Sequence, residues 1–149
     1  MKKTLKLSYT KQVLIEVLNA ATHGIGTLLS IIATVALILK GVQHGSHLEI
    51  VSYAIYGASL FLLFLNSTLY HSFSLTRYKD VFQKIDHSSI YLLIAGTYTP
   101  YLMVSIGGLV GYGFLALVWA LAIGGIVFEV SKEIVSSTIP LQFYHFLGT

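Results

Sequence analysis

Long runs of uncharged, mostly apolar residues, separated by short charged segments, set the pattern of the chain. Residues 17–39, 50–76 and 87–128 carry no formal charge and number 23, 27 and 42. A helix needs about 20 apolar residues to cross a bilayer, because the hydrocarbon layer is about 30 Å thick and each residue rises about 1.5 Å. The first two runs therefore predict one span each, and the third is long enough for two.

The predicted fold class is all-α, a polytopic membrane helix bundle with four transmembrane helices and a partial fifth. Ser105-Ile106-Gly107-Gly108 divides the third run, since paired glycines favour a tight connection. The period-two alternation expected of a membrane β-barrel is absent from the sequence. The last 16 residues are too few to cross and too apolar for a solvated tail, so they either open a fifth span or lie along the interface. The predicted spans are 19–39, 51–71, 87–105 and 109–128, with a partial span at 134–149.

Composition excludes several classes of protein. Of 149 residues, 55% are hydrophobic and 10% are charged, whereas soluble domains have about 45–50% and about 25%. The absence of cysteine excludes a disulfide scaffold and a Cys-ligated metal site. With a net charge of +3, the basic residues are too few and too scattered to bind nucleic acid. We therefore predict one membrane domain over residues 1–149, with membrane lipid as its partner; the sequence does not define an oligomeric state.

The distribution of lysine and arginine predicts a cytoplasmic N-terminus. Eight of these residues lie on the side of the N-terminus and the 72–86 loop, whereas the other side has Lys40 alone. A cleaved signal peptide is the alternative for the first run, because its start is basic. That run is long, contains Asn19 and His23, and has no small-residue cleavage site before Lys40, so we favour a span.

Three polar clusters lie near the predicted cytoplasmic ends of three spans: Glu16, Asn19 and His23 on the first, Ser67 and His71 on the second, and Asp86 on the third. The first three fall within about 60° of one another on a helix, and Ser67 is one turn from His71. An imidazole and a carboxylate that converge are what a metal or acid–base site needs. The alternative is ordinary headgroup chemistry, with His71 interfacial, Glu16 a first-turn acid and Asp86 a helix N-cap.

The remaining histidines and the glycines have structural interpretations that involve no functional site. His44 and His47 are expected to be solvated in the outer loop. His87 points about 100° away from Asp86, toward a different helix. Glycines within the spans are expected to allow close helix packing; they are Gly24, Gly26, Gly57, Gly96, Gly124 and Gly125.

The three polar clusters, in this order along the chain, match the motifs of a known protein family. Glu16-x-x-Asn19-x-x-x-His23, then Ser67-x-x-x-His71, then the run from Asp86-His87 to Thr99-Pro100 resemble the haemolysin III family. This family belongs to the progestin and adipoQ receptor superfamily and is similar to membrane-embedded hydrolases that include alkaline ceramidases. The resemblance implies a seven-helix bundle in a bacterial inner membrane, with a zinc ion near the cytoplasmic face.

The resemblance also implies roles for the residues. His71 would be one zinc ligand, Asp86 would hold the reacting water and Ser67 would lie beside it. Glu16, Asn19 and His23 would support the site. Two further zinc ligands would come from a His-x-x-x-His motif on the seventh helix, and no such motif occurs in this sequence. We therefore expect a truncated family member that contains the first part of the fold and does not hold zinc tightly.

Three functions remain open from the sequence. The first is a zinc-dependent hydrolase of lipid amides or esters, with its site at the cytoplasmic face. The second is a pore-forming or membrane-perturbing haemolysin, which would cause cytolysis; however, the polar residues cluster at one end and form no continuous stripe. The third is a receptor-like protein of membrane homeostasis, in which zinc is structural.

Overall fold

The computed structural model describes the backbone of residues 8–138 and the side chains of residues 8–131. Four long helices account for nearly all of this part of the chain. They are α1 (Tyr9–Gln43), α2 (His47–Phe73), α3 (Lys79–Pro100) and α4 (Gly108–Thr138), with a π-helical segment, η1 (Tyr101–Ile106), that continues α3.

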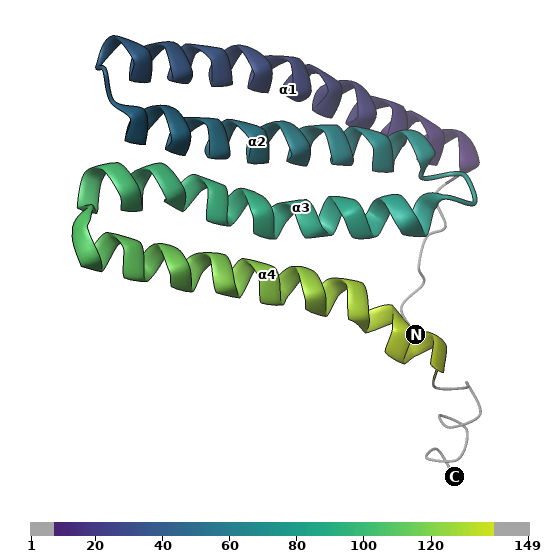
Figure 1. The fold of residues 1–149 in the computed structure, drawn as a ribbon. Helices are drawn as coiled ribbons and strands as arrows, with labels where there is room; N and C mark the ends of the chain where they lie inside the picture. Colours follow the sequence, from purple (N-terminus) through teal and green to yellow (C-terminus); the bar gives the residue numbers. More distant parts are fainter. Residues whose placement is uncertain (1–7, 139–149) are drawn as a thin grey trace, which may run out of the picture.

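Each of the four helices is long and apolar enough to cross a membrane, which confirms the predicted number of spans. The helices run antiparallel in chain order, and each packs only against its neighbours in the sequence (Figure 1). They form one open layer, since α1 and α4 do not touch. Large apolar side chains are exposed along all of the helices, as expected where lipid is the solvent.

Tight connections fix the ends of the helices. Between η1 and α4, Gly107 and Gly108 both have φ of +60°, a conformation that glycine adopts without strain. The predicted break at this point is therefore confirmed. Between α1 and α2, the Ser46 hydroxyl caps α2 by accepting a hydrogen bond from the backbone N–H of Glu49.

Only the first five residues of the predicted partial span at 134–149 belong to the described part of the chain. Residues 134–138 continue α4 without a break, because no glycine or proline interrupts the helix after Glu129. Residues 139–149 lie outside the described part of the chain. A fifth span thus stays a prediction.

Small and hydroxyl-bearing residues pack the helices together. A Cβ atom on Gly57 would meet the side chain of Thr34 on α1, and one on Gly96 would meet Ser59 on α2. Gly57 and Gly96 confirm the predicted close packing, whereas the prediction is wrong for Gly124, because a Cβ atom added there would meet nothing within 4 Å. Ser59 donates to the Ile55 carbonyl and Thr34 donates to the Ser30 carbonyl, so each of these two hydroxyls is satisfied within its own helix.

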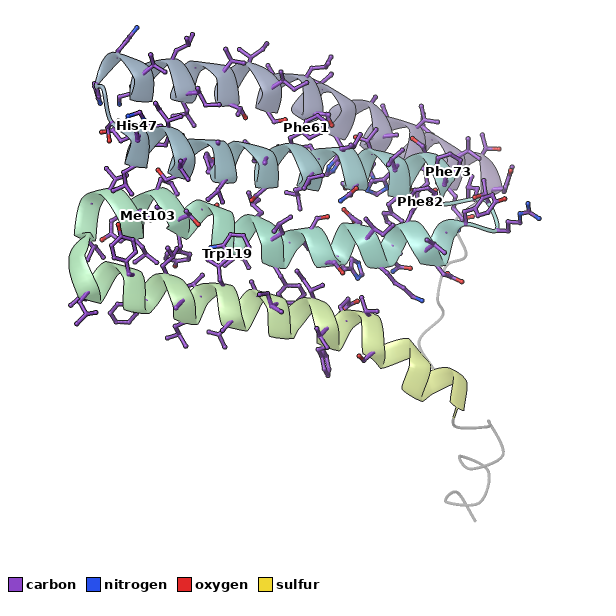
Figure 2. All side chains as sticks on the ribbon, in the orientation of Figure 1. His47, Phe61, Phe73, Phe82, Met103 and Trp119 are labelled. Atoms are coloured by element: carbon purple, nitrogen blue, oxygen red, sulfur yellow. The ribbon has the colours of Figure 1, made fainter. Side chains whose placement is uncertain are left out.

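One end of the layer gathers the start of α1, the end of α2, the start of α3 and the end of α4 (Figure 1). At this end, Phe73 and Phe82 stack with ring centroids 4.8 Å apart and close the connection between α2 and α3 (Figure 2). The predicted polar clusters on α1, α2 and α3 therefore all lie toward the same end.

A histidine–carboxylate cluster as the candidate functional site

A contact between α1 and α2 forms the centre of the candidate site. The His71 Nδ1 lies 2.6 Å from the Glu16 Oε2, so the imidazole N–H donates to the carboxylate. Their side chains are only 16% and 26% exposed. Glu16 stands two turns into α1 and His71 lies in the last turn of α2; because the helices are antiparallel, these positions meet.

His23 extends this pair along the same face of α1. Seven residues, or two turns, separate it from Glu16. Its ring centroid lies 5.4 Å from that of His71 and 6.0 Å from that of Phe64. The His23 Nδ1 is buried without a hydrogen-bond partner. The structure thus brings together Glu16, His23 and His71, and half-buried Asn19 lies between the two α1 residues in sequence.

The two remaining predicted residues lie on α2 and α3. Ser67 is buried one turn before His71. Asp86 is half-buried on α3 and makes no hydrogen bond or ion pair with His71. Its alternative role as an N-cap is wrong, because α3 begins at Lys79 and places Asp86 two turns inside the helix. The expected function of Asp86 at the site stays a prediction.

The described side chains fit one side of the zinc site that the resemblance implies, and not the whole of it. Among residues 8–131, no three His, Cys, Asp or Glu side chains group closely enough to hold a metal ion. His71, however, has the arrangement typical of a metal-binding histidine. One ring nitrogen is hydrogen-bonded to a carboxylate, and the other is left for the metal. The Nε2 atom of His71 is thus the donor available on this side.

A second histidine–glutamate pair, between α3 and α4, lies toward the same end of the layer. The His87 Nδ1 is 3.1 Å from the Glu129 Oε1, which confirms that His87 faces another helix. The sequence pattern did not identify Glu129 as the partner of His87, because Glu129 only marks the end of an uncharged run. The position of Glu129 could have indicated such a contact, because a carboxylate at the end of an apolar run needs a polar partner.

A third pair lies at the opposite end of the layer. His44 was expected to be solvated, and it is half-exposed, but its Nδ1 is 2.9 Å from the Glu49 Oε2. His47 is exposed, as expected.

Four antiparallel helices of membrane-spanning length, with histidine–carboxylate pairs at their ends, define a polytopic integral membrane protein. A family model described as "Haemolysin-III related" matches residues 11–147. The chain therefore belongs to the haemolysin III family, as its motifs indicated.

Two relatives show how much of such a protein the chain represents. It is 53% identical over 115 residues to a protein named "Hemolysin-3 homolog" from Bacillus subtilis (strain 168), a match that covers 77% of this chain and 54% of the relative. It is 50% identical over 115 residues to "Hemolysin-3" from Bacillus cereus, a match that covers 77% of this chain and 52% of the relative. The chain thus spans about half the length of the curated relatives it matches. No solved structure matches it significantly.

Proposed function

We propose that the chain forms part of a zinc-dependent hydrolase of lipid amides or esters, with the site at the cytoplasmic face of the membrane. The observation that carries this proposal is the Glu16–His71 contact of 2.6 Å, half-buried beside His23. Ionisable side chains inside membrane helices are costly and therefore rare, and they mark candidate functional sites.

Each residue of this cluster has a distinct task in the proposal. Glu16 accepts a hydrogen bond from the Nδ1–H group of His71 and so fixes the tautomer and the ring orientation that present Nε2. His71 would hold the zinc ion through Nε2, with further ligands from outside the described residues. When bound, zinc would polarise a lipid carbonyl and acidify a nearby water.

Asp86 is the proposed base, and Ser67 its neighbour. Asp86 and Glu16 each lie seven residues, about two turns, inside their helices, counted from the same end of the layer. A carboxylate at this depth is suited to accept a proton from water as it attacks a lipid carbonyl. Buried Ser67 offers a hydroxyl that would hydrogen-bond the same water or Asp86.

The orientation of the protein belongs to the same proposal. Arg77, Lys79 and Lys84 lie at the end of the layer that carries Glu16 and His71, whereas Lys40 lies near the other end. Cytoplasmic loops carry the excess of such residues. We place the site at the cytoplasmic face of a bacterial inner membrane, in keeping with the two bacterial relatives.

Lipid turnover tests the proposal. The chain, extended by the remaining part of the Bacillus subtilis relative, is reconstituted in vesicles that contain a short-chain ceramide, and release of fatty acid is measured. We expect His71→Ala and Asp86→Asn to reduce turnover at least 100-fold. His44→Ala is the matched control, because it removes a histidine from the His–Glu pair at the opposite end of the layer, and it should retain activity. Undiminished turnover in both site variants would reject the proposal.

A membrane-perturbing function is the second candidate, because the relatives bear the name hemolysin. Against a pore, the buried hydroxyls of Ser30, Ser59 and Thr99 donate to carbonyls of their own helices and form no water-lined stripe. Leakage of a vesicle-trapped dye with and without a chelator separates the two. Leakage that a chelator leaves unchanged, without lipid turnover, supports the pore; zinc binding with neither activity supports the receptor-like protein.

A further inference from the structure

The His71 ring is restrained by more than its hydrogen bond to Glu16. The ring centroids of His23 and Tyr70 lie 5.4 Å and 5.0 Å from that of His71. A single hydrogen bond leaves an imidazole free to tilt about the N–H···O direction, whereas ring contacts at these distances limit the tilt. The direction in which the His71 Nε2 points therefore depends on Glu16 and also on where the His23 ring is held.

Packing against Phe64 holds the His23 ring. The His23 Nδ1 is buried without a hydrogen-bond partner, so no hydrogen bond at that atom fixes the ring. The Phe64 ring on α2 lies 6.0 Å from it between centroids, with 57° between the ring planes. This separation is within the range of favourable aromatic contacts. Phe64 precedes His71 by seven residues, or two turns, so both side chains leave the same face of α2 toward α1.

Phe64 in turn needs a glycine at position 26. A Cβ atom on Gly26 would lie 2.6 Å from the Phe64 Cδ1 and 2.7 Å from its Cε1. Real Cβ contacts are essentially never that short, so the ring lies directly on the α1 backbone. By contrast, a Cβ atom on Gly24 would lie 3.8 Å from the Thr68 methyl group, an ordinary van der Waals contact. The absence of a side chain at Gly26, one turn after His23, therefore sets the position of the Phe64 ring.

We propose that Gly26 and Phe64 are positioning residues for His71. Phe64, seated on the α1 backbone at Gly26, holds the His23 ring, and the His23 ring limits the tilt of the His71 imidazole. A metal ligand needs a side chain that packing locks as well as hydrogen bonding. This inference rests on the proposed function, because it assigns the two residues to the orientation of a zinc ligand.

The orientation of His71 can be measured in the chain itself, without a metal. Nitrogen NMR of the chain in detergent, isotope-labelled at histidine, distinguishes the two tautomers of each imidazole, and His71→Ala identifies the signal. We expect a single Nδ1–H form for His71, because Glu16 accepts from that nitrogen. Gly26→Ala displaces Phe64 and should replace the single form by a mixture of both tautomers. Gly24→Ala, the matched control, should keep the single form.

Zinc affinity gives a second measurement, on the chain extended by the remaining part of the Bacillus subtilis relative. Gly26→Ala should weaken zinc binding about tenfold, the low end of the range found when a group behind a metal-bound histidine is removed. Phe64→Leu removes the ring and should give a similar loss, which keeps the test available if Gly26→Ala fails to fold. Gly24→Ala should bind as the unaltered protein does. Gly57→Ala, which overpacks the same helix interface against Thr34, controls for destabilisation and should also leave the zinc affinity unchanged.

The two measurements separate this inference from the proposed function. An extended protein that binds no zinc rejects the proposed zinc site, whereas a tautomer change in Gly26→Ala and not in Gly24→Ala would still support the positioning of His71. The same His71 spectrum in both glycine variants, or equal zinc affinity in both, overturns the positioning. Equal losses of zinc affinity in Gly26→Ala and Gly57→Ala overturn it as well, because loosened packing would then be the cause.

Discussion

At the scale of single residues, close helix packing rests on positions where no side chain fits. Gly57 faces the Thr34 side chain across the α1–α2 interface, whereas Gly124 on α4 has open space around it. Gly57→Ala should therefore destabilise the protein by about 1–3 kcal/mol, because the added methyl overpacks the interface. Gly124→Ala, the same change in open space, should be neutral or stabilise by up to about 1 kcal/mol. Thermal unfolding in detergent measures both, and equal melting temperatures would contradict the packing.

Residue spacing predicted some of the site and left out the rest. That Glu16, Asn19 and His23 share one face follows from the 3.6-residue period, which is local. The contact of Glu16 with His71 depends on how far α1 and α2 slide along each other, and no local pattern contains that register. For the same reason the partner of His87 was not identified, although its direction toward another helix was.

At the scale of elements, a hydrogen bond joins α3 to α4. The Trp119 Nε1 donates to the Thr99 Oγ1 over 3.1 Å, and Thr99 is only 1% exposed. Thr99→Val keeps the shape but leaves the indole N–H without an acceptor, so we expect a loss of about 1–3 kcal/mol. Trp119 is the single tryptophan, so its fluorescence emission should shift as well. Thr97→Val, at an exposed threonine two residues away, should change neither quantity.

The turn between η1 and α4 depends on the backbone conformation of Gly107. Gly107 has φ of +60° and ψ of −171°, a region essentially restricted to glycine. Gly107→Ala should cost about 1–3 kcal/mol in a chemical denaturation experiment. Gly113→Ala, within α4 and in open space, is the control; a similar loss in both variants would show that the turn is not the cause.

The helix boundaries show where sequence patterns reach their limit. Hydropathy and charge predicted four spans and the break at Gly107 because lipid thickness and glycine conformation determine both. They placed the start of the third span at residue 87, whereas α3 begins at Lys79. The first two turns of α3 contain Lys79, Asp80 and Lys84, so hydropathy and charge exclude them from the predicted span although they are helical.

For the whole molecule, the proposed orientation puts the end with Glu16 and His71 at the cytoplasmic face. Single cysteines in this cysteine-free chain test the orientation. In intact cells, a membrane-impermeant maleimide that passes the outer envelope should label Gln43→Cys, near the outer connection. It should label Thr76→Cys only after the inner membrane is opened. Labelling in the reverse pattern would place the site on the outer side.

In the proposed site, Glu16 holds His71 in the orientation that binds zinc, so zinc affinity should depend on both residues. Bound zinc is measured for the chain alone and for the chain extended by the remaining part of the Bacillus subtilis relative. In the extended protein, Glu16→Gln should weaken zinc binding about 10–100-fold, the range found when a carboxylate behind a metal-bound histidine is removed. His71→Ala should abolish binding, and His44→Ala should leave it unchanged. Equal zinc affinity in the extended protein and in its Glu16→Gln and His71→Ala variants would contradict this role of Glu16.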